Sequence, residues 1–360
     1  MRIEDKWKIK PYTYFVKTEW VDNLKEFLLS TSLSNYKLRE IFESKLAEYC
    51  KCEYTVAVNS GTSAILMSMV ALGLKKGDTV IGPNYGNFAW ANCCRFLELN
   101  VIAIDVRRDN FCLDEKLLKD YLDKHPGKIK AACYINQAGY TGPQLMEVAS
   151  ICKYYNVLLL EDSCNAIGQW YNGKHAGTTG DVGFISFGTP KLLTCGEGGA
   201  ILINNDRLYK VCKDLSYQGG WYSEPVHTRL NVGVNFVMPI QNAHFLSSQL
   251  DDIDELLLMR KTVCDEYVNA GFNIQRFHQP PSIYMHYSTN PLKVIKSGDS
   301  FKVQFLFKSY SQFGHLFGSE NTNTPVANDL ENHIITLPNM LKLDESAINI
   351  IKAAVKFGER

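Results

Sequence analysis

Lys191 and Asp162 are the two side chains whose types and setting suggest chemistry. Lys191 lies in a run of small and turn-forming residues, ISFGTPKLLTCGEGGA (185–200), and Asp162 ends an apolar segment earlier in the chain. A primary amine can form a Schiff base with a carbonyl, and a carboxylate can keep a pyridine nitrogen protonated. Together they are the minimal apparatus of pyridoxal phosphate chemistry. Because a lone lysine in a loop is usually solvated surface, the hypothesis depends on the neighbouring motifs.

A phosphate site is predicted at the run NSGTSA (59–64), which follows an apolar segment at 55–58 and opens a helical pattern. Gly61 permits close backbone approach, the free N–H groups of a first helical turn bind anions, and the Thr62 hydroxyl adds a donor. Ser186, in the later loop, could donate to the same phosphate. Taken alone, such a run is more often an ordinary strand-to-helix turn with a serine or threonine cap.

Asp162 belongs to the run EDSCNA (161–166), directly after the apolar residues 157–160. An unpaired buried carboxylate is costly, so at least one of the two acids should have a partner. A protonated ring nitrogen would suit Asp162. A plain helix cap is an equally good interpretation until Lys191 is considered with it.

The elements that must position these residues alternate between short β-rich runs and helical patterns. Short apolar strands separated by helices predict an α/β fold with a mostly parallel sheet covered on both faces. Such sheets bind ligands at the carboxyl ends of their strands. The predicted strands are residues 55–58, 79–81, 101–106, 131–135, 157–160, 184–187 and 200–203.

The pattern changes past residue 240, where we predict a boundary between a large domain (1–240) and a smaller C-terminal α/β domain (241–360). Residues 241–267 are predicted to form one long helix. A closing helix is predicted at 345–356. The apolar stripe of the long helix consists of Leu246, Leu250, Ile253 and Leu257.

Composition argues against several classes of protein. Lys+Arg and Asp+Glu both number 38 among the 360 residues, so no overall field favours nucleic acid or an anionic membrane. The start of the chain lacks a signal-like apolar run, and no stretch is apolar enough to span a bilayer, which predicts a cytoplasmic protein. The eleven cysteines lack the paired CxxC spacing of a zinc site, so we predict reduced thiols and no metal.

Six motifs together resemble, in order and spacing, the DegT/DnrJ/EryC1/StrS family of sugar aminotransferases. The resemblance runs from about residue 38 to the C-terminal helix. It implies the aspartate aminotransferase-like fold (type I of the pyridoxal phosphate enzymes) and a homodimer with shared active sites. The motifs are VNSGTSA (58–64), EDSCNA (161–166), SFGTPK (186–191), GEGGA (196–200), GVNF (233–236) and ITLP (335–338).

The resemblance also implies a role for each matching residue. Lys191 would hold pyridoxal 5'-phosphate as a Schiff base, and Asp162 would contact its pyridine nitrogen. To act as a base near neutral pH, Lys191 needs a pKa lowered by burial and by a nearby cation. The phosphate would be bound by Gly61, Thr62 and Ser186 of one subunit and Asn235 of its neighbour.

Several positions depart from the family pattern. Asn165 stands where a Gln usually touches the phenolic oxygen of the cofactor; it is one methylene shorter but carries the same amide. An ungapped alignment puts Asn87 where an aromatic side chain normally stacks on the pyridine ring, and Phe88 would replace it after a local shift. Val237 stands in place of an arginine. These changes leave the ring packing and the substrate contacts open.

By resemblance, glutamate is the amino donor and a nucleotide-linked 4-keto-6-deoxy sugar the acceptor, giving a 4-amino-4,6-dideoxy sugar of the viosamine or perosamine type. Trp221, His227 and Arg229, within residues 216–230, could meet the nucleotide diphosphate. An exposed loop without catalytic importance is an equally good interpretation. Other functions left open are a 3-keto sugar aminotransferase, a sugar dehydratase, which typically has His in place of Lys191, and a non-catalytic paralogue that binds the cofactor.

Overall fold

The described part of the structure, a computed structural model, comprises residues 15–30, 37–189, 191–219, 232–272, 274, 285–287, 320–321, 323–337 and 349. Within these residues a sheet has the strand order β1-β9-β8-β5-β4-β2-β3-β11, and only the pairs that involve β9 are antiparallel. Each predicted strand overlaps one of these, which confirms the mostly parallel sheet. The strands are β1 (Tyr54–Val58), β2 (Thr79–Pro83), β3 (Asn100–Ile104), β4 (Ala131–Ile135), β5 (Leu158–Asp162), β8 (Val182–Ser186), β9 (Gly199–Ile203) and β11 (Glu320–Asn321).

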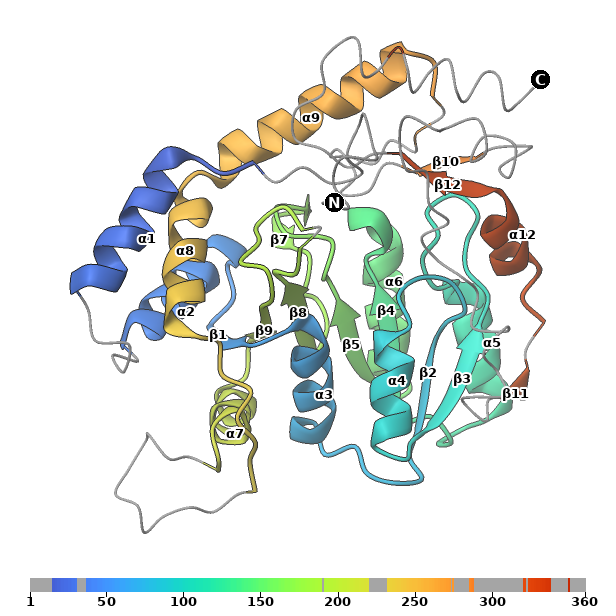
Figure 1. The fold of residues 1–360 in the computed structure, drawn as a ribbon. Coiled ribbons are helices and arrows are strands. Elements are labelled where there is room, and N and C mark those ends of the chain that lie inside the picture. Colours follow the sequence, from blue (N-terminus) through green and yellow to red (C-terminus); the bar gives the residue numbers. More distant parts are fainter. Residues whose placement is uncertain are drawn as a thin grey trace, which may run out of the picture.

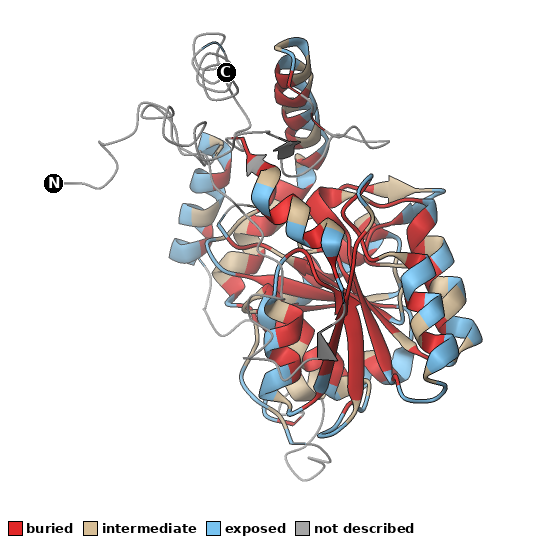
Figure 2. Ribbon diagram, turned by 90° about the vertical axis from the view of Figure 1, so that its right-hand side faces the viewer, coloured by how far each residue is buried: buried red, intermediate tan, exposed pale blue. Residues whose placement is uncertain are grey.

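Helices cover both faces of this sheet (Figures 1 and 2). On one face, α3 (Gly61–Ala71), α4 (Ala89–Phe96) and α7 (Asp206–Ser216) pack on the strands through a single apolar cluster. The other face carries two clusters, one beneath α5 and α6 and one beneath α2 and α8. Strands enclosed in this way are buried on both sides, which is why they are apolar nearly throughout. The helices on this second face are α5 (Glu115–Lys124), α6 (Pro143–Tyr154), α2 (Lys37–Cys50) and α8 (Ile240–Asp251). Helix α1 (Thr18–Ser30) packs against α8.

The prediction of one helix over residues 241–267 is wrong, because two helices, α8 and α9 (Ile253–Asn269), meet at Asp252. The carboxylate of Asp252 accepts a hydrogen bond from Trp20 Nε1 at 2.7 Å and lies 2.9 Å from Lys17 Nζ. These contacts tie the bend to the segment around α1. The apolar period continues across the bend, since both helices bury their stripes, and it therefore gave no sign of the break.

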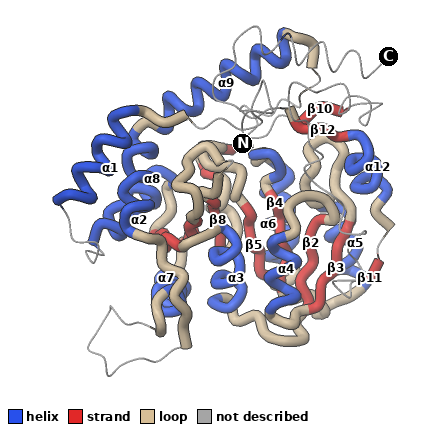
Figure 3. Tube along the Cα trace, viewed as in Figure 1, coloured by secondary structure: helices blue, strands red, loops and turns tan. Residues whose placement is uncertain are grey.

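Past α9, the described elements include α12 (Pro325–His333) and an antiparallel pair, β10 (Met285–Tyr287) and β12 (Ile334–Thr336), which lies apart from the large sheet (Figure 3). Asp105 joins α12 to the sheet, because its carboxylate accepts the N–H groups of Val326 and Ala327 at 2.8 Å. The predicted closing helix at 345–356 lies outside the described residues, except for 349, and the boundary at 240 stays a prediction. No helix in the described ranges is long and apolar enough to cross a membrane.

The carboxyl end of β5 is held by Glu161, whose side chain is fully buried. Its Oε1 accepts hydrogen bonds from Asn136 Nδ2 at 2.8 Å and from Gly177 N at 2.6 Å. Its Oε2 accepts from Thr179 N at 2.8 Å and Gly180 N at 3.0 Å. A buried charge is stable only when its lone pairs are satisfied in this way. Glu161 therefore fixes the loop before β8 against β5, next to Asp162.

We expect Glu161→Gln to lower the free energy of unfolding by about 3 kcal/mol or more. The amide keeps one acceptor oxygen but turns an NH₂ group toward backbone donors, which are then buried without an acceptor. Glu147→Gln is the matched control, since Glu147 is exposed on α6 and should change stability little. Urea unfolding of both variants measures the difference, and equal stability of the two would contradict the anchoring role.

Candidate active site

The three sequence motifs meet at one edge of the sheet. Asp162 is the last residue of β5 and Ser186 the last of β8. The third motif leads from β1, which runs in the same direction as β8, into the first turn of α3. The carboxyl ends of these strands therefore lie together, as the sequence predicted.

Gly61 brings the start of α3 into contact with the two other motifs. A Cβ atom on Gly61 would lie 2.9 Å from Ser186 Cβ and 3.2 Å from Cys164 Sγ, which is too close for any side chain. On the next strand, a Cβ on Gly199 would lie 2.5 Å from the carbonyl of Ser60. Both glycines therefore allow the backbone of the α3 turn to pack against β8 and β9. The start of α3 therefore lies beside Ser186, and a helix N-terminus next to a hydroxyl suits a phosphate.

Lys191 lies over the end of β5. Its Nζ donates a hydrogen bond to Asn165 Oδ1 at 2.5 Å. Burial lowers the pKa of Lys191, and the positive charge of Arg260 lowers it further, against the opposing effects of Cys164 and Asp162. Burial disfavours the charged form of an amine, so this side chain carries a proton less readily than a surface lysine does.

Asp162 shows the opposite shift. Its side chain is buried, and Oδ1 accepts a hydrogen bond from the backbone N–H of Cys164 at 3.0 Å. Burial raises the pKa of Asp162, while the hydrogen bonds of Cys164 and the charge of Lys191 oppose the rise. A further cation beside this carboxylate, such as a protonated ring nitrogen, would stabilise its charged form.

The structure leaves the predicted ring-stacking position open. Asn87 is exposed, and its Oδ1 accepts a hydrogen bond from Ala89 N at 2.9 Å, at the start of α4. Phe88 precedes α4 with 49% of its surface exposed. Neither side chain is enclosed in the described part of the site, so the aromatic contact stays a prediction for both.

The segment that carries Asn235 runs beside the predicted phosphate turn, because Asn59 donates its backbone N–H to the carbonyl of Phe236 at 2.8 Å. Asn235 is exposed in the single chain, in a β-bridge with Tyr217, and Val237 forms a bridge with Val58 at the end of β1. The three predicted substrate residues, Trp221, His227 and Arg229, lie outside the described residues.

The sequence reasoning did not single out Arg260, a buried residue of α9 whose charge acts on Lys191. Arg260 follows Ile253 and Leu257 at helical spacing, on the apolar stripe itself. An arginine on the apolar stripe of a predicted helix was the signal that could have identified it.

The eleven cysteines are all free thiols, as predicted.

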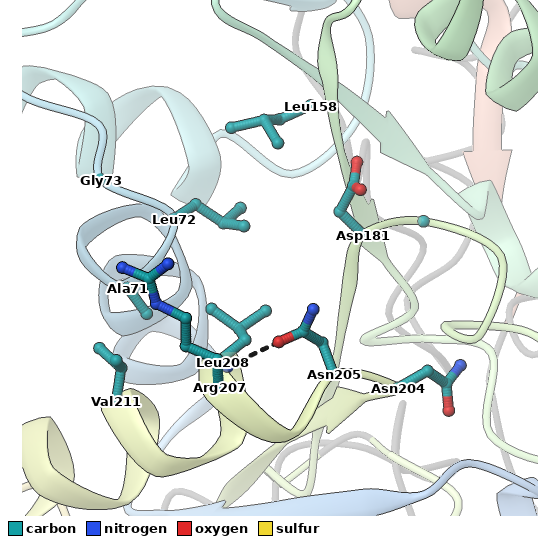
Figure 4. Close-up of a pocket in the computed structure, with 11 residues that line it drawn as sticks. Ala71, Leu72, Gly73, Leu158, Asp181, Asn204, Asn205, Arg207, Leu208 and Val211 are labelled. Atoms are coloured by element: carbon teal, nitrogen blue, oxygen red, sulfur yellow. Dashed lines mark hydrogen bonds between the residues drawn. The ribbon is translucent and has the colours of Figure 1, made fainter.

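A cavity of about 640 Å³ lies at the opposite edge of the sheet (Figure 4). Leu158, which lines it, is the first residue of β5, whereas Asp162 is the last. The cavity opens between the end of α3, near Leu72, and the start of α7, where Asn205 Oδ1 accepts a hydrogen bond from Leu208 N at 2.9 Å. It is therefore separate from the Lys191 site.

Comparison with known proteins agrees with this geometry. The sequence profile of the DegT/DnrJ/EryC1/StrS aminotransferase family matches residues 16–356. The chain belongs to this family.

Relatives and solved structures extend the comparison. GDP-perosamine synthase of Caulobacter vibrioides is 30% identical over 256 residues, which is 69% of this chain but only 63% of that protein, less than two-thirds of its length. GDP-perosamine synthase of Vibrio cholerae is 24% identical over 90% of this chain and 91% of its own. The structure of Helicobacter pylori PseC, an aminotransferase involved in the biosynthesis of pseudoaminic acid, matches 96% of this chain and 97% of its own, with a TM-score of 0.86 and 21% identity. The similarity to PseC confirms the predicted α/β fold of this chain.

Membership of the DegT/DnrJ/EryC1/StrS family makes the chain an aminotransferase with pyridoxal phosphate as its cofactor. The residues present fit that cofactor. Gly61 lets the start of α3 pack directly against Ser186, Asp162 is a buried carboxylate suited to a cationic ring nitrogen, and Lys191 is a partly buried amine whose pKa is lowered. When bound, pyridoxal phosphate supplies an electron sink that stabilises the carbanion left by loss of an α-proton.

We expect borohydride reduction of the protein with pyridoxal phosphate to attach the cofactor covalently to Lys191, because its pKa is lowered by burial. Peptide mass spectrometry locates the label. Lys191→Ala should lose both the label and all turnover, whereas Lys153→Ala, at an exposed position on α6, should keep both. Full labelling or activity in Lys191→Ala would refute the assignment.

Proposed function

We propose that this protein transfers the amino group of glutamate to a nucleotide-linked 4-keto-6-deoxy sugar and so forms a 4-amino-4,6-dideoxy sugar nucleotide in the cytoplasm. The main support is the pairing of Lys191 with Asn165 beside Asp162, in a member of the DegT/DnrJ/EryC1/StrS family. The names of its relatives supply the sugar class, since two of them are GDP-perosamine synthases.

Each residue then has a defined task. Lys191 Nζ, whose pKa is lowered by burial, would take the α-proton of the amino donor and would be placed to return a proton once the cofactor is bound. General acid–base help of this kind contributes roughly a hundred- to ten-thousand-fold. Asp162 keeps the ring nitrogen protonated, and the amide of Asn165 orients Lys191 and the phenolic oxygen. The α3 turn at Gly61 and Thr62, together with Ser186, binds the phosphate and sets the position of the ring.

The substrate class can be tested with a panel of keto-sugars linked to dTDP, UDP and GDP, each offered with glutamate. We expect one 4-keto-6-deoxy sugar to gain an amino group, detected by mass spectrometry and located on the ring by NMR. Lys191→Ala is the control and should form no product. Amination at carbon 3 alone would favour the 3-keto alternative, and amination of none would contradict the proposed function.

We also infer a homodimer in which Asn235 binds the phosphate in the partner's site. The support is the exposure of Asn235 in the single chain, next to Val232 and Val234, whose side chains are 90% and 44% exposed. Apolar side chains exposed together are suited to burial against another subunit.

Mixing two inactive variants tests this arrangement. Lys191→Ala removes the catalytic amine, and Asn235→Asp places a negative charge against the phosphate. If each site uses Lys191 from one chain and Asn235 from the other, mixed dimers contain one intact site, and activity should return after the subunits exchange. Mixtures that stay inactive although mass analysis detects mixed dimers, or a fully active monomer, would refute the shared site.

A further inference from the structure

Gln137 is a buried amide without hydrogen-bond partners among the residues that the structure describes. Its side chain is fully buried, and neither Nε2 nor Oε1 forms a hydrogen bond there. A buried donor or acceptor left unpaired destabilises a fold, so native structures keep few of them. Positions that break this rule tend to be functional sites.

Gln137 lies at the same edge of the sheet as Lys191. It is the second residue after β4, and Asn136, just before it, donates its backbone N–H to the carbonyl of Asp162 at 2.8 Å. On its other side is the loop that follows β2. A Cβ atom on Gly86 in that loop would lie 2.8 Å from Gln137 Oε1. Gln137 therefore lies between Asp162 and the loop that carries Asn87.

The surrounding backbone leaves space for this amide. Gly86 has a φ of +126°, and a Cβ there would also lie 3.1 Å from Ile135 Cδ1. Any other residue at Gly86 would be strained and would press on the Gln137 side chain. Two neighbouring amide oxygens, Asn84 Oδ1 and Asn136 Oδ1, are likewise buried without a partner in the described chain. Polar atoms with spare hydrogen-bonding capacity thus gather at the ends of β2 and β4.

We propose that Gln137 binds a hydroxyl group of the keto-sugar ring and so helps to select the sugar that is aminated. This inference rests on the sugar aminotransferase function proposed above. A neutral amide offers donors and an acceptor, which match a hydroxyl group. The phosphates of the nucleotide and the carboxylates of glutamate are bound more strongly by cationic donors. A site built around such an amide rejects a substrate that lacks the hydroxyl, because the amide is again left unpaired.

The first test uses the protein without cofactor. Gln137→Leu replaces the amide with an apolar side chain of similar size, so the melting temperature should stay the same or rise. Gln144→Leu is the matched control. Gln144 is also buried, but its amide is paired with Asn110 and with the carbonyl of Leu113, so its loss should lower the melting temperature. An equal fall in both variants would assign Gln137 a structural role and overturn the proposal.

The second test measures the two half-reactions of the holoenzyme separately. Gln137→Leu should bind pyridoxal phosphate and react with glutamate like the wild type. Amination of GDP-4-keto-6-deoxy-D-mannose, or of the sugar selected by the panel above, should fall roughly ten- to a hundredfold. The 2-deoxy or the 3-deoxy counterpart of that sugar should be a poor substrate for the wild type, and the variant should no longer distinguish it from the parent.

Three results would overturn the role of Gln137 in sugar binding: equal losses in both half-reactions, weaker cofactor binding, or an unchanged preference for the parent sugar. These differ from failure of the proposed function, in which the wild type itself would aminate no sugar of the panel.

Discussion

The burial of Glu161 is the constraint on which the active site depends. Its carboxylate binds three backbone N–H groups of the loop before β8 and the amide of Asn136 after β4. The carboxyl ends of β4 and β5 are therefore tied to the segment that leads into β8. Asp162 is the next residue, and alternation along β5 turns its side chain to the opposite face of the sheet. Glu161 thus stabilises the end of the strand, and the Asp162 carboxylate stays available to bind a cationic group.

The strands could be predicted from the sequence because sheet burial imposes a local pattern. Each central strand is enclosed on both faces, and its apolar run is visible in a few consecutive residues. The site motifs were visible for a similar reason, since Asp162 and Ser186 directly end such runs. Contacts between distant segments leave no such pattern. The bend at Asp252 depends on Trp20 and Lys17, and no local rule connects those residues.

Gln137 and Arg260 show a second limit of sequence reasoning. A glutamine in a loop and an arginine in an amphipathic helix are usually solvated, so neither attracts attention by type. Their importance arises from burial, which the sequence does not display at single positions. Both are buried at or beside the site in the folded chain. The family resemblance did not help either, because its motifs cover neither position.

Burial also decides which nucleophile in the site can react with a carbonyl group. Cys93 and Cys164 lie close to Asp162, and Cys164 Sγ is near Gly61. Burial raises the pKa of Cys93 to about 12 and that of Cys164 well above its ordinary value, with the charge of Asp162 adding to both shifts. The same environment lowers the pKa of Lys191. Because a low dielectric favours the neutral form of every group, it suppresses the reactive thiolate and favours the reactive amine. Burial around Lys191 therefore favours the lysine over the neighbouring cysteines as the reactive nucleophile.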